Sequence, residues 1–433
     1  MFDPILIRSL GLFLPLIAAW LLWMWREPDR RQGATALLAS LWNVPTLLLL
    51  HLLALRFGWW QFNAEGGLFL GIPIDLLLGW ILLWGVVPAL AFRRFPPLLV
   101  LWLMFGLDLL VMPLTEPVIQ LGSNWLIGEV VGLVFCLLPA FLLARWTAEE
   151  RHLIGRACLQ FVIFSALTFW TLPTIILTLT GGSWAPFLSR ATWINSLGLQ
   201  LLVIPAVLGI SALQEFVRRG NGTPLPYDPP QRLVRSGVYA YIANPMQFSM
   251  VLLLIGWGLM LESLWVSGAG LMALIYSAGL AAWDEGGDLA QRFGTDWSAY
   301  RRAVGPWWFR WQPASAEIPG QTRAKLYVAS ECGPCSELGG WFLTHQPVGL
   351  DILAAEDHPR HDLTRLTYDP CDGCPEEVGV AALARALEHL HLGWALIGWV
   401  IRLPVIIQFI QLIVDAVGGE PRLIRRRSEQ INP

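Results

Sequence analysis

The sequence predicts an all-α polytopic membrane protein of about nine transmembrane helices, followed by a small C-terminal α/β domain. Apolar side chains make up 55% of the 433 residues and charged side chains only 14%, whereas charged residues are roughly a quarter of an ordinary soluble protein. Long apolar runs recur up to residue 283, and short alternating segments with paired cysteines follow residue 322. The 24 Trp residues suit aromatic belts at two membrane interfaces.

Nine apolar runs are long enough to cross about 30 Å of hydrocarbon, which takes roughly 20 helical residues. The first begins near Met1 and reaches Trp25, and because no small-residue cleavage site precedes Glu27 we interpret it as a span and not as a signal peptide. The other eight are 36–55, 67–91, 97–114, 126–145, 153–179, 193–214, 244–261 and 264–283. Residues 393–417 are also apolar, but Arg402 and Pro404 interrupt them, so no tenth crossing is predicted there.

The positions of arginine predict the orientation. Arg-rich connections at 26–31, 93–94, 145–156 and 218–235 alternate with connections that hold almost none. Cytoplasmic loops carry the excess of basic residues, so we expect the N-terminus outside and residues 284–433 inside, in a bacterial inner (plasma) membrane. The net charge of −3 favours no nucleic-acid partner; the predicted partner is the lipid bilayer, and the sequence does not set an oligomeric state.

Three carboxylates, Asp75, Asp108 and Glu129, lie within or beside the apolar runs of residues 1–150. Charges at that depth are costly and are usually functional or paired. Either they line an outward-facing polar cavity, or they pair with Arg56, His51 or water.

Residues 223–311 hold an ordered set of motifs. An Arg-rich loop ends in Ser236-Gly-Val-Tyr239, Asn244-Pro245 opens an apolar hairpin, and Asp284-Glu285 closes it before Phe293-Gly294. The predicted topology puts both ends of the hairpin on the cytoplasmic side. We therefore expect a shared site at that membrane interface.

This set resembles the isoprenylcysteine carboxyl methyltransferase and phospholipid methyltransferase superfamily of membrane enzymes. The resemblance implies S-adenosylmethionine as cofactor. The methyl acceptor would be either a lipophilic molecule, such as a lipid or a lipophilic small molecule, or a thiol. It also implies that Tyr239, Asn244 and Pro245 line the cofactor pocket. Asp284 and Glu285 would bind the ammonium or ribose hydroxyls of the cofactor, because carboxylates give cationic groups charge-assisted hydrogen bonds, and Glu285 is the candidate catalytic base.

Gly256-Trp-Gly258 resembles the Gly-Xaa-Gly element that binds the cofactor in phospholipid methyltransferases. At 1.5 Å per residue, Gly256 lies roughly 18 Å along the helix from Asn244. Close packing of helices through small residues is the alternative interpretation of the two glycines.

The C-terminal region predicts a strand, Lys325 to Ser330, then Cys332-Gly-Pro-Cys335, then a helix from Ser336 to His345. Strand, Cys-Xaa-Xaa-Cys and helix together indicate the redox entry of a thioredoxin-like fold, which the topology would place in the cytoplasm. A helix follows from Val378 to His389, then Trp399-Val-Ile-Arg402-Leu-Pro404 and an apolar closing helix, and this remainder resembles the DCC thiol-disulfide oxidoreductase family. The predicted domains are therefore a five-span region (1–150), a methyltransferase-like membrane domain (151–313), a linker (314–322) and a thioredoxin-like domain (323–433).

Two roles remain open for the cysteines. In a redox site Cys332 attacks as a thiolate and Cys335 resolves the mixed disulfide, with Cys371 and Cys374 as exchange partners. Alternatively, these four cysteines bind one zinc ion, with His358 and His361 as spare ligands.

Three functions follow as hypotheses. The first is S-adenosylmethionine-dependent methyl transfer with an attached dithiol domain. The second is a membrane-anchored thiol-disulfide oxidoreductase on an inactive methyltransferase fold, since Ala243 replaces the arginine that usually precedes His/Asn-Pro. The third is a non-enzymatic scaffold with a structural zinc site.

Overall fold

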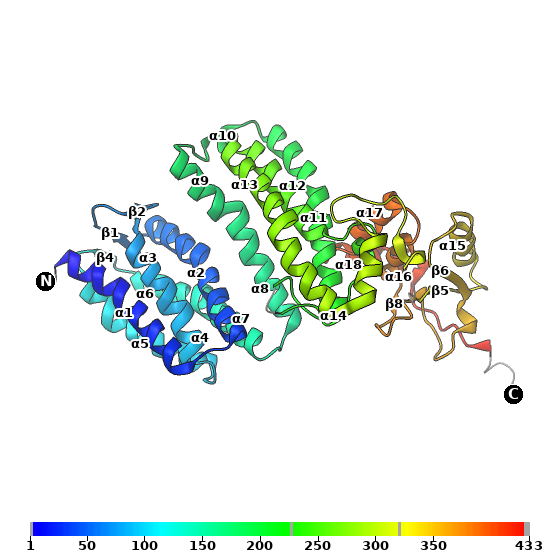
Figure 1. The fold of residues 1–433 in the computed structure, drawn as a ribbon, viewed down its shortest axis with the longest axis horizontal. Helices are drawn as coiled ribbons and strands as arrows, with labels where there is room; N and C mark the ends of the chain where they lie inside the picture. The colour runs from blue at the N-terminus through cyan, green and yellow to red at the C-terminus, as the bar shows by residue number, and fades with distance from the viewer. Residues whose placement is uncertain (1–2, 226–227, 319–321, 428–433) are drawn as a thin grey trace. The chain divides into compact units, whose positions relative to one another are not determined.

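A computed structural model describes residues 3–225, 228–318 and 322–427, without the side chains of Asp284, Glu285 and Ala316 (Figure 1). The chain divides into two compact units, Met1–Leu179 with Leu225–Pro229, and Thr180–Pro224 with Pro230–Pro433. The second unit joins the last membrane helices to the C-terminal region. The finer domain boundaries remain predictions.

The chain is an integral membrane protein, mostly helical, with a small mixed α/β region at its C-terminal end. Eight helices of the described ranges are long and apolar enough to cross a membrane. The remaining predicted span, 244–261, forms α12 (Pro245–Met260), whose 16 residues fall short of a full crossing. The predicted orientation depends on nine crossings and stays a prediction.

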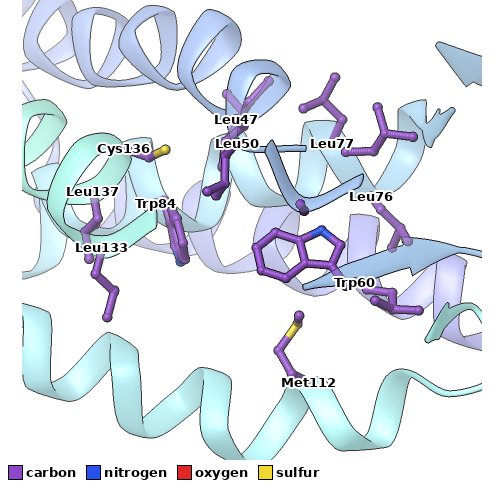
Figure 2. Packing of buried hydrophobic residues seen from close by; sticks show 14 of the residues in the cluster. Leu47, Leu50, Trp60, Leu76, Leu77, Trp84, Met112, Leu133, Cys136 and Leu137 are labelled. Atoms are coloured by element: carbon purple, nitrogen blue, oxygen red, sulfur yellow. The ribbon is translucent and has the colours of Figure 1, made fainter. Parts of the chain in front are cut away.

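The first unit is a helical assembly around an aromatic core. Trp60, Trp84 and Met112 pack there with leucines from several helices (Figure 2). Two short antiparallel strand pairs join helix ends. Strand β1 (Trp60–Phe62) pairs with β4 (Ile119–Leu121), and β2 (Leu68–Phe69) pairs with β3 (Ile72–Pro73). The helices are α1 (Pro4–Arg26), α2 (Arg30–Phe57), α3 (Ile74–Ile81), α4 (Val87–Ala91), α5 (Pro97–Val111), α6 (Trp125–Gly132), α7 (Leu138–Ala148), α8 (Leu153–Ala166) and α9 (Leu172–Thr180).

Three pairs of these helices, α3 with α4, α6 with α7 and α8 with α9, are each continuous through a turn of π-helix. The turns η1 (Leu82–Val86), η3 (Leu133–Leu137) and η4 (Leu167–Thr171) each end two residues before a proline, at Pro88, Pro139 and Pro173. Proline lacks an N–H and its ring crowds the carbonyl four residues earlier. A widened turn accommodates that ring without ending the helix.

The carboxylates of the first unit are paired, but with partners other than Arg56 or His51. Asp75 accepts a hydrogen bond from Arg8 at 2.7 Å, and Asp108 hydrogen-bonds to Glu129. All three therefore have a protein partner, whereas the pairing alternative predicted Arg56, His51 or water.

In the second unit, α12 packs between α11 (Thr192–Gly220) and α13 (Leu264–Tyr276), as Figure 1 shows. A Cβ on Gly256 would lie 2.5 Å from Leu202 of α11, and one on Gly258 would lie 2.3 Å from the backbone nitrogen of Ser267 in α13. Both glycines thus permit close helix packing. The short helix α10 (Ala185–Ser189) precedes α11, and η6 (Ser277–Ala281) joins α13 to α14 (Ala282–Ala303).

The C-terminal region contains a four-stranded sheet of order β6-β5-β7-β8. Strand β5 (Ala324–Val328) pairs in parallel with β6 (Leu350–Ala354) and antiparallel with β7 (Thr367–Asp369), which pairs antiparallel with β8 (Glu377–Val378). Helix α15 (Gly333–Thr344) connects the parallel strands and α16 (Val380–Leu387) follows β8; both contribute to one core with β5. The predicted strand, Cys-Xaa-Xaa-Cys and helix are confirmed as elements.

Two helices close the chain, α17 (Leu392–Ile401) and α18 (Ile406–Val414), and they meet at 90°. The break falls at Arg402 to Val405, where the sequence predicted an interruption. Arg402, at this break, is buried and donates hydrogen bonds to Glu215 of α11 and to Glu388.

Replacing Gly258 by Ala tests the close packing of α12 on α13. We expect the free energy of unfolding to fall by about 1–3 kcal/mol, because the new Cβ meets backbone that cannot move aside. Gly268→Ala is the matched control, since nothing lies within 4 Å of a Cβ there. Chemical denaturation in detergent, followed by tryptophan fluorescence, measures both; equal effects would contradict the packing.

Candidate functional site

The Ser236-Gly237 element is fixed to the end of α11 by Glu215. The Ser236 hydroxyl donates a hydrogen bond to the Glu215 carboxylate. Gly237 has a φ of 60°, and a Cβ on it would lie 3.0 Å from the carboxylate carbon of Glu215. Both the left-handed backbone and the close approach require glycine here.

Glu215 is itself fully buried and is the centre of an ionic network. Arg385 donates to its two oxygens at 3.0 and 2.8 Å, and Arg402 donates at 3.3 Å. Arg219, one helical turn further along α11, lies 3.9 Å away. A buried carboxylate is stable only with such compensation.

Two more glutamates balance these arginines. Glu388 accepts from Arg385 at 2.8 Å and from Arg402 at 2.9 Å. Glu377 accepts from Arg385 at 2.8 Å and from Arg219 at 3.1 Å. Burial alone would raise the pKa of Glu377, but the nearby guanidinium groups outweigh it and lower that pKa. The network therefore joins α11 to β8, α16 and the α17–α18 break.

Two buried tyrosines hold the segment between Ser236 and α12. The Tyr300 hydroxyl donates to the carbonyl of Tyr239 at 3.0 Å, and the Tyr241 hydroxyl donates to the carbonyl of Glu388 at 2.9 Å. Burial raises the pKa of both phenols, so both remain donors. Gly294 breaks α14 with a φ of 52° and a ψ of −122°, a conformation open to glycine alone.

A cavity of about 400 Å³ lies beside this segment. Ser236, Gly237 and Ala240 line it from the motif loop, and Phe293 and Asp296 line it from α14. The C-terminal region contributes the opposite lining: Thr322, Ala324, Gly349, Tyr368, Pro370, Asp372, Cys374, Arg385, Glu388 and His389. Segments far apart in the sequence thus share one cavity.

The cavity carries both signs of charge. Arg219, Arg232, Arg235 and Arg385 line it together with carboxylates. Among the described residues, the side chains of Arg235 and Asp296 have no hydrogen-bond or ion-pair partner, so both side chains are available to a ligand.

The predicted cofactor residues do not line this cavity. Tyr239 is buried in a cluster with Ala212 and Val234, and Asn244 caps α12 with Pro245 as the first helical residue. In the chain Tyr239 directly precedes Ala240, and Asn244 and Pro245 follow Ala240 by four and five residues. The side chains of Asp284 and Glu285 lie outside the described part of the chain, although their backbone belongs to α14.

The cysteines behave as two different pairs. Cys332 and Cys335 form a disulfide at the start of α15, whereas Cys371 and Cys374 are free. Burial raises the pKa of Cys371, and Arg232 approaches the Cys374 sulfur at 3.8 Å. Within the described ranges the four cysteines do not form a cluster of metal ligands.

Residues 193–295 match the profile of the phospholipid methyltransferase family. The matched segment runs from α11 into α14 and contains Ser236-Gly237, Asn244-Pro245 and Asp284-Glu285. No curated protein and no solved structure matches the chain. The DCC-type assignment of the C-terminal region has no support from these comparisons.

The sequence did not predict that Glu215 pairs with Arg385 and Arg402. Two signals were present: a carboxylate at the end of an apolar helix, and an arginine that interrupts an apolar run. Charges in such positions require partners, but the partners are 170 and 187 residues away. No local pattern shows that distance.

Replacing Arg402 by Met tests the network. The variant leaves Glu215 and Glu388 short of a buried partner, so we expect the free energy of unfolding to fall by about 3–5 kcal/mol. Arg323→Met removes an exposed ion pair with Asp351 and is expected to cost about 0–1 kcal/mol. Urea denaturation of the detergent-solubilised chain distinguishes the two variants. If Arg402→Met lowers the free energy of unfolding no more than Arg323→Met does, the network does not stabilise the fold.

The environment of His389 makes the stability of the fold depend on pH. Its Nδ1 lies 2.8 Å from the Val348 carbonyl and its Nε2 lies 2.9 Å from the Tyr368 hydroxyl, and burial lowers its pKa below the ordinary 6.5. The folded state therefore favours neutral His389. This contribution to stability is complete above pH 6.5 and is lost as the pH falls through the lowered pKa.

His389→Gln is expected to reduce the loss of thermal stability between pH 7.5 and 5, measured in detergent. His345→Gln changes an exposed histidine and serves as the control. An unchanged pH profile in the His389 variant would contradict this origin.

Proposed function

We propose that the second unit transfers a methyl group from S-adenosylmethionine to a lipid-type acceptor at the membrane interface. The observation that carries the proposal is the family match over residues 193–295. Residues of two motifs in that segment, Ser236-Gly237 and Phe293, line one cavity. Apolar helices continue from the same segment, which suits an acceptor that arrives through the bilayer.

The cavity fits the chemistry of the cofactor. Its volume of about 400 Å³ falls within the roughly 300–1,000 Å³ of small-molecule sites. S-adenosylmethionine has an ammonium and a carboxylate on one carbon, and Asp296 and Arg235 offer the opposite charges without other partners. When bound, it supplies an electrophilic methyl group on a sulfonium.

The chain's own residues then bind, orient and exclude water. Methyl transfer by in-line displacement needs alignment more than acid catalysis. The buried network fixes the Ser236-Gly237 wall, and the Tyr300 hydrogen bond fixes the backbone that leads to Asn244. Ala243, in the place of the family's arginine, packs against Tyr300 and Val304, so that position contributes packing and no charge.

The predicted site residues remain part of the proposal. Glu285 is the proposed base for an acceptor that must lose a proton. Asp284, Glu285, Tyr239, Asn244 and Pro245 are the cofactor contacts that the resemblance implies; Tyr239, Asn244 and Pro245 follow or adjoin the cavity-lining Ala240 in the chain but do not line the cavity themselves. Gly256 and Gly258 complete the set implied by the resemblance, although their close contacts with α11 and α13 support a packing role.

Dithiol exchange by the C-terminal region is a second candidate, supported by one observation. The Cys332–Cys335 disulfide lies where β5 leads into α15. Reduction of insulin by dithiothreitol tests it: acceleration that depends on Cys332 supports the candidate, and Cys332→Ser with undiminished activity excludes it.

The methyltransferase proposal predicts measurable binding of S-adenosylmethionine to the detergent-solubilised chain by calorimetry. Asp296→Asn and Arg235→Met should each weaken it by about 10-fold, the loss of one charge-assisted hydrogen bond. Asp288→Asn, on the same helix but outside the cavity lining, should not. Glu285→Gln should lower the transfer of radiolabelled methyl groups to phospholipid vesicles. Absence of cofactor binding would sink the proposal.

A further inference from the structure

One group of metal-binding side chains lies outside the cavity. His358, His361 and Glu376 place one ligand atom each within 4.8 Å of one another, which no other such group in the described ranges does. Nε2 of His358 lies 3.2 Å from one oxygen of Glu376, and Nε2 of His361 lies 3.4 Å from the other. The histidines belong to the loop after β6, and Glu376 directly precedes β8.

The position of His358 is fixed by its surroundings. Its side chain is buried, and its ring packs edge-on against Tyr327 with centroids 4.7 Å apart. Its Nδ1 lies 3.0 Å from the His361 carbonyl. Donation from Nδ1 to a backbone carbonyl is the usual arrangement behind a metal-bound histidine, because it leaves the Nε2 lone pair free.

This tautomer creates a conflict that a cation removes. With Nδ1 protonated, a neutral His358 turns its Nε2 lone pair towards a carboxylate oxygen 3.2 Å away, and two acceptors at that distance repel. A cation between them converts the repulsion into two bonds. The other tautomer, in which Nδ1 accepts from the His361 N–H at 3.3 Å and Nε2 donates to Glu376, needs no metal ion, so metal binding is coupled to the first tautomer.

We propose that His358, His361 and Glu376 bind one divalent transition metal ion of the zinc type. Two imidazoles and one carboxylate are typical zinc donors, and a site with three protein ligands keeps a fourth position for water or a ligand. Arg360 contacts one oxygen of Glu376 at 2.5 Å and also Asp369. Arg360 therefore orients the carboxylate, whose two oxygens face the Nε2 atoms of His358 and His361.

This site differs from the four-cysteine zinc site predicted from the sequence. It needs neither the disulfide-bonded pair nor Cys371 and Cys374, and it is independent of the proposed methyl transfer. It would clamp the loop after β6 to the residue that precedes Glu377, which belongs to the buried ionic network.

Zinc binding to the metal-stripped full chain in detergent tests the proposal. Titration against a chromogenic chelator should give one zinc per chain, and cobalt substitution should give visible absorption without a thiolate charge-transfer band. His361→Ala and Glu376→Gln should each weaken zinc binding by at least about 10-fold, the lower range for loss of a supporting contact. His345→Ala, an exposed histidine of α15's C-terminal end, should bind zinc as the unchanged chain does.

His361 has a side chain 57% exposed, so its replacement should leave the melting temperature of the metal-free chain unchanged. This keeps loss of binding separate from loss of fold. The proposal is overturned if the chain binds no zinc, if both variants bind it normally, or if a thiolate band appears and disappears in Cys371→Ser/Cys374→Ser.

Discussion

The structure of the second unit depends on the burial of one carboxylate, Glu215, at the end of a membrane helix. A buried charge of this kind is tolerated only where opposite charges meet it, and the chain supplies them from a helix and a helix break near its C-terminus. The three arginines and three glutamates balance in sign. The C-terminal region is therefore an integral part of the unit that holds the methyltransferase-like segment, joined to it by charge as well as by the apolar contacts of Tyr241 with Trp399.

The same carboxylate shapes the candidate site. It fixes Ser236 through a hydrogen bond and requires glycine at 237, and these two residues form part of the cavity wall. Arg385 both neutralises Glu215 and lines the cavity. Residues of the buried network thus also line the cavity, where the matched segment within α11 to α14 meets side chains from beyond residue 320.

Much of the fold could be predicted, because local patterns determine it. Apolar runs locate the membrane helices, and the alternation before Cys332 locates β5. Other features depend on contacts that no local pattern encodes: the partners of Glu215, the pairing of Asp75 with Arg8, and the approach of His358 to Glu376. The predicted span 244–261 is two residues longer than α12, because Asn244 takes the N-cap position and Leu261 the C-cap position. The match over residues 193–295 falls on the segment that carries the motifs, whereas the roles of the motif residues stay predictions and the arginines of the cavity required the tertiary structure.

The central claim is that the motif loop and the C-terminal region enclose one ligand. Ultraviolet crosslinking of radiolabelled S-adenosylmethionine to the full chain, followed by peptide mapping, tests it directly. The account predicts label on peptides from 232–240 or 293–296 and also on peptides from 368–389, with both suppressed by excess unlabelled cofactor. Label confined to the membrane helices, with none on the C-terminal peptides, would contradict it.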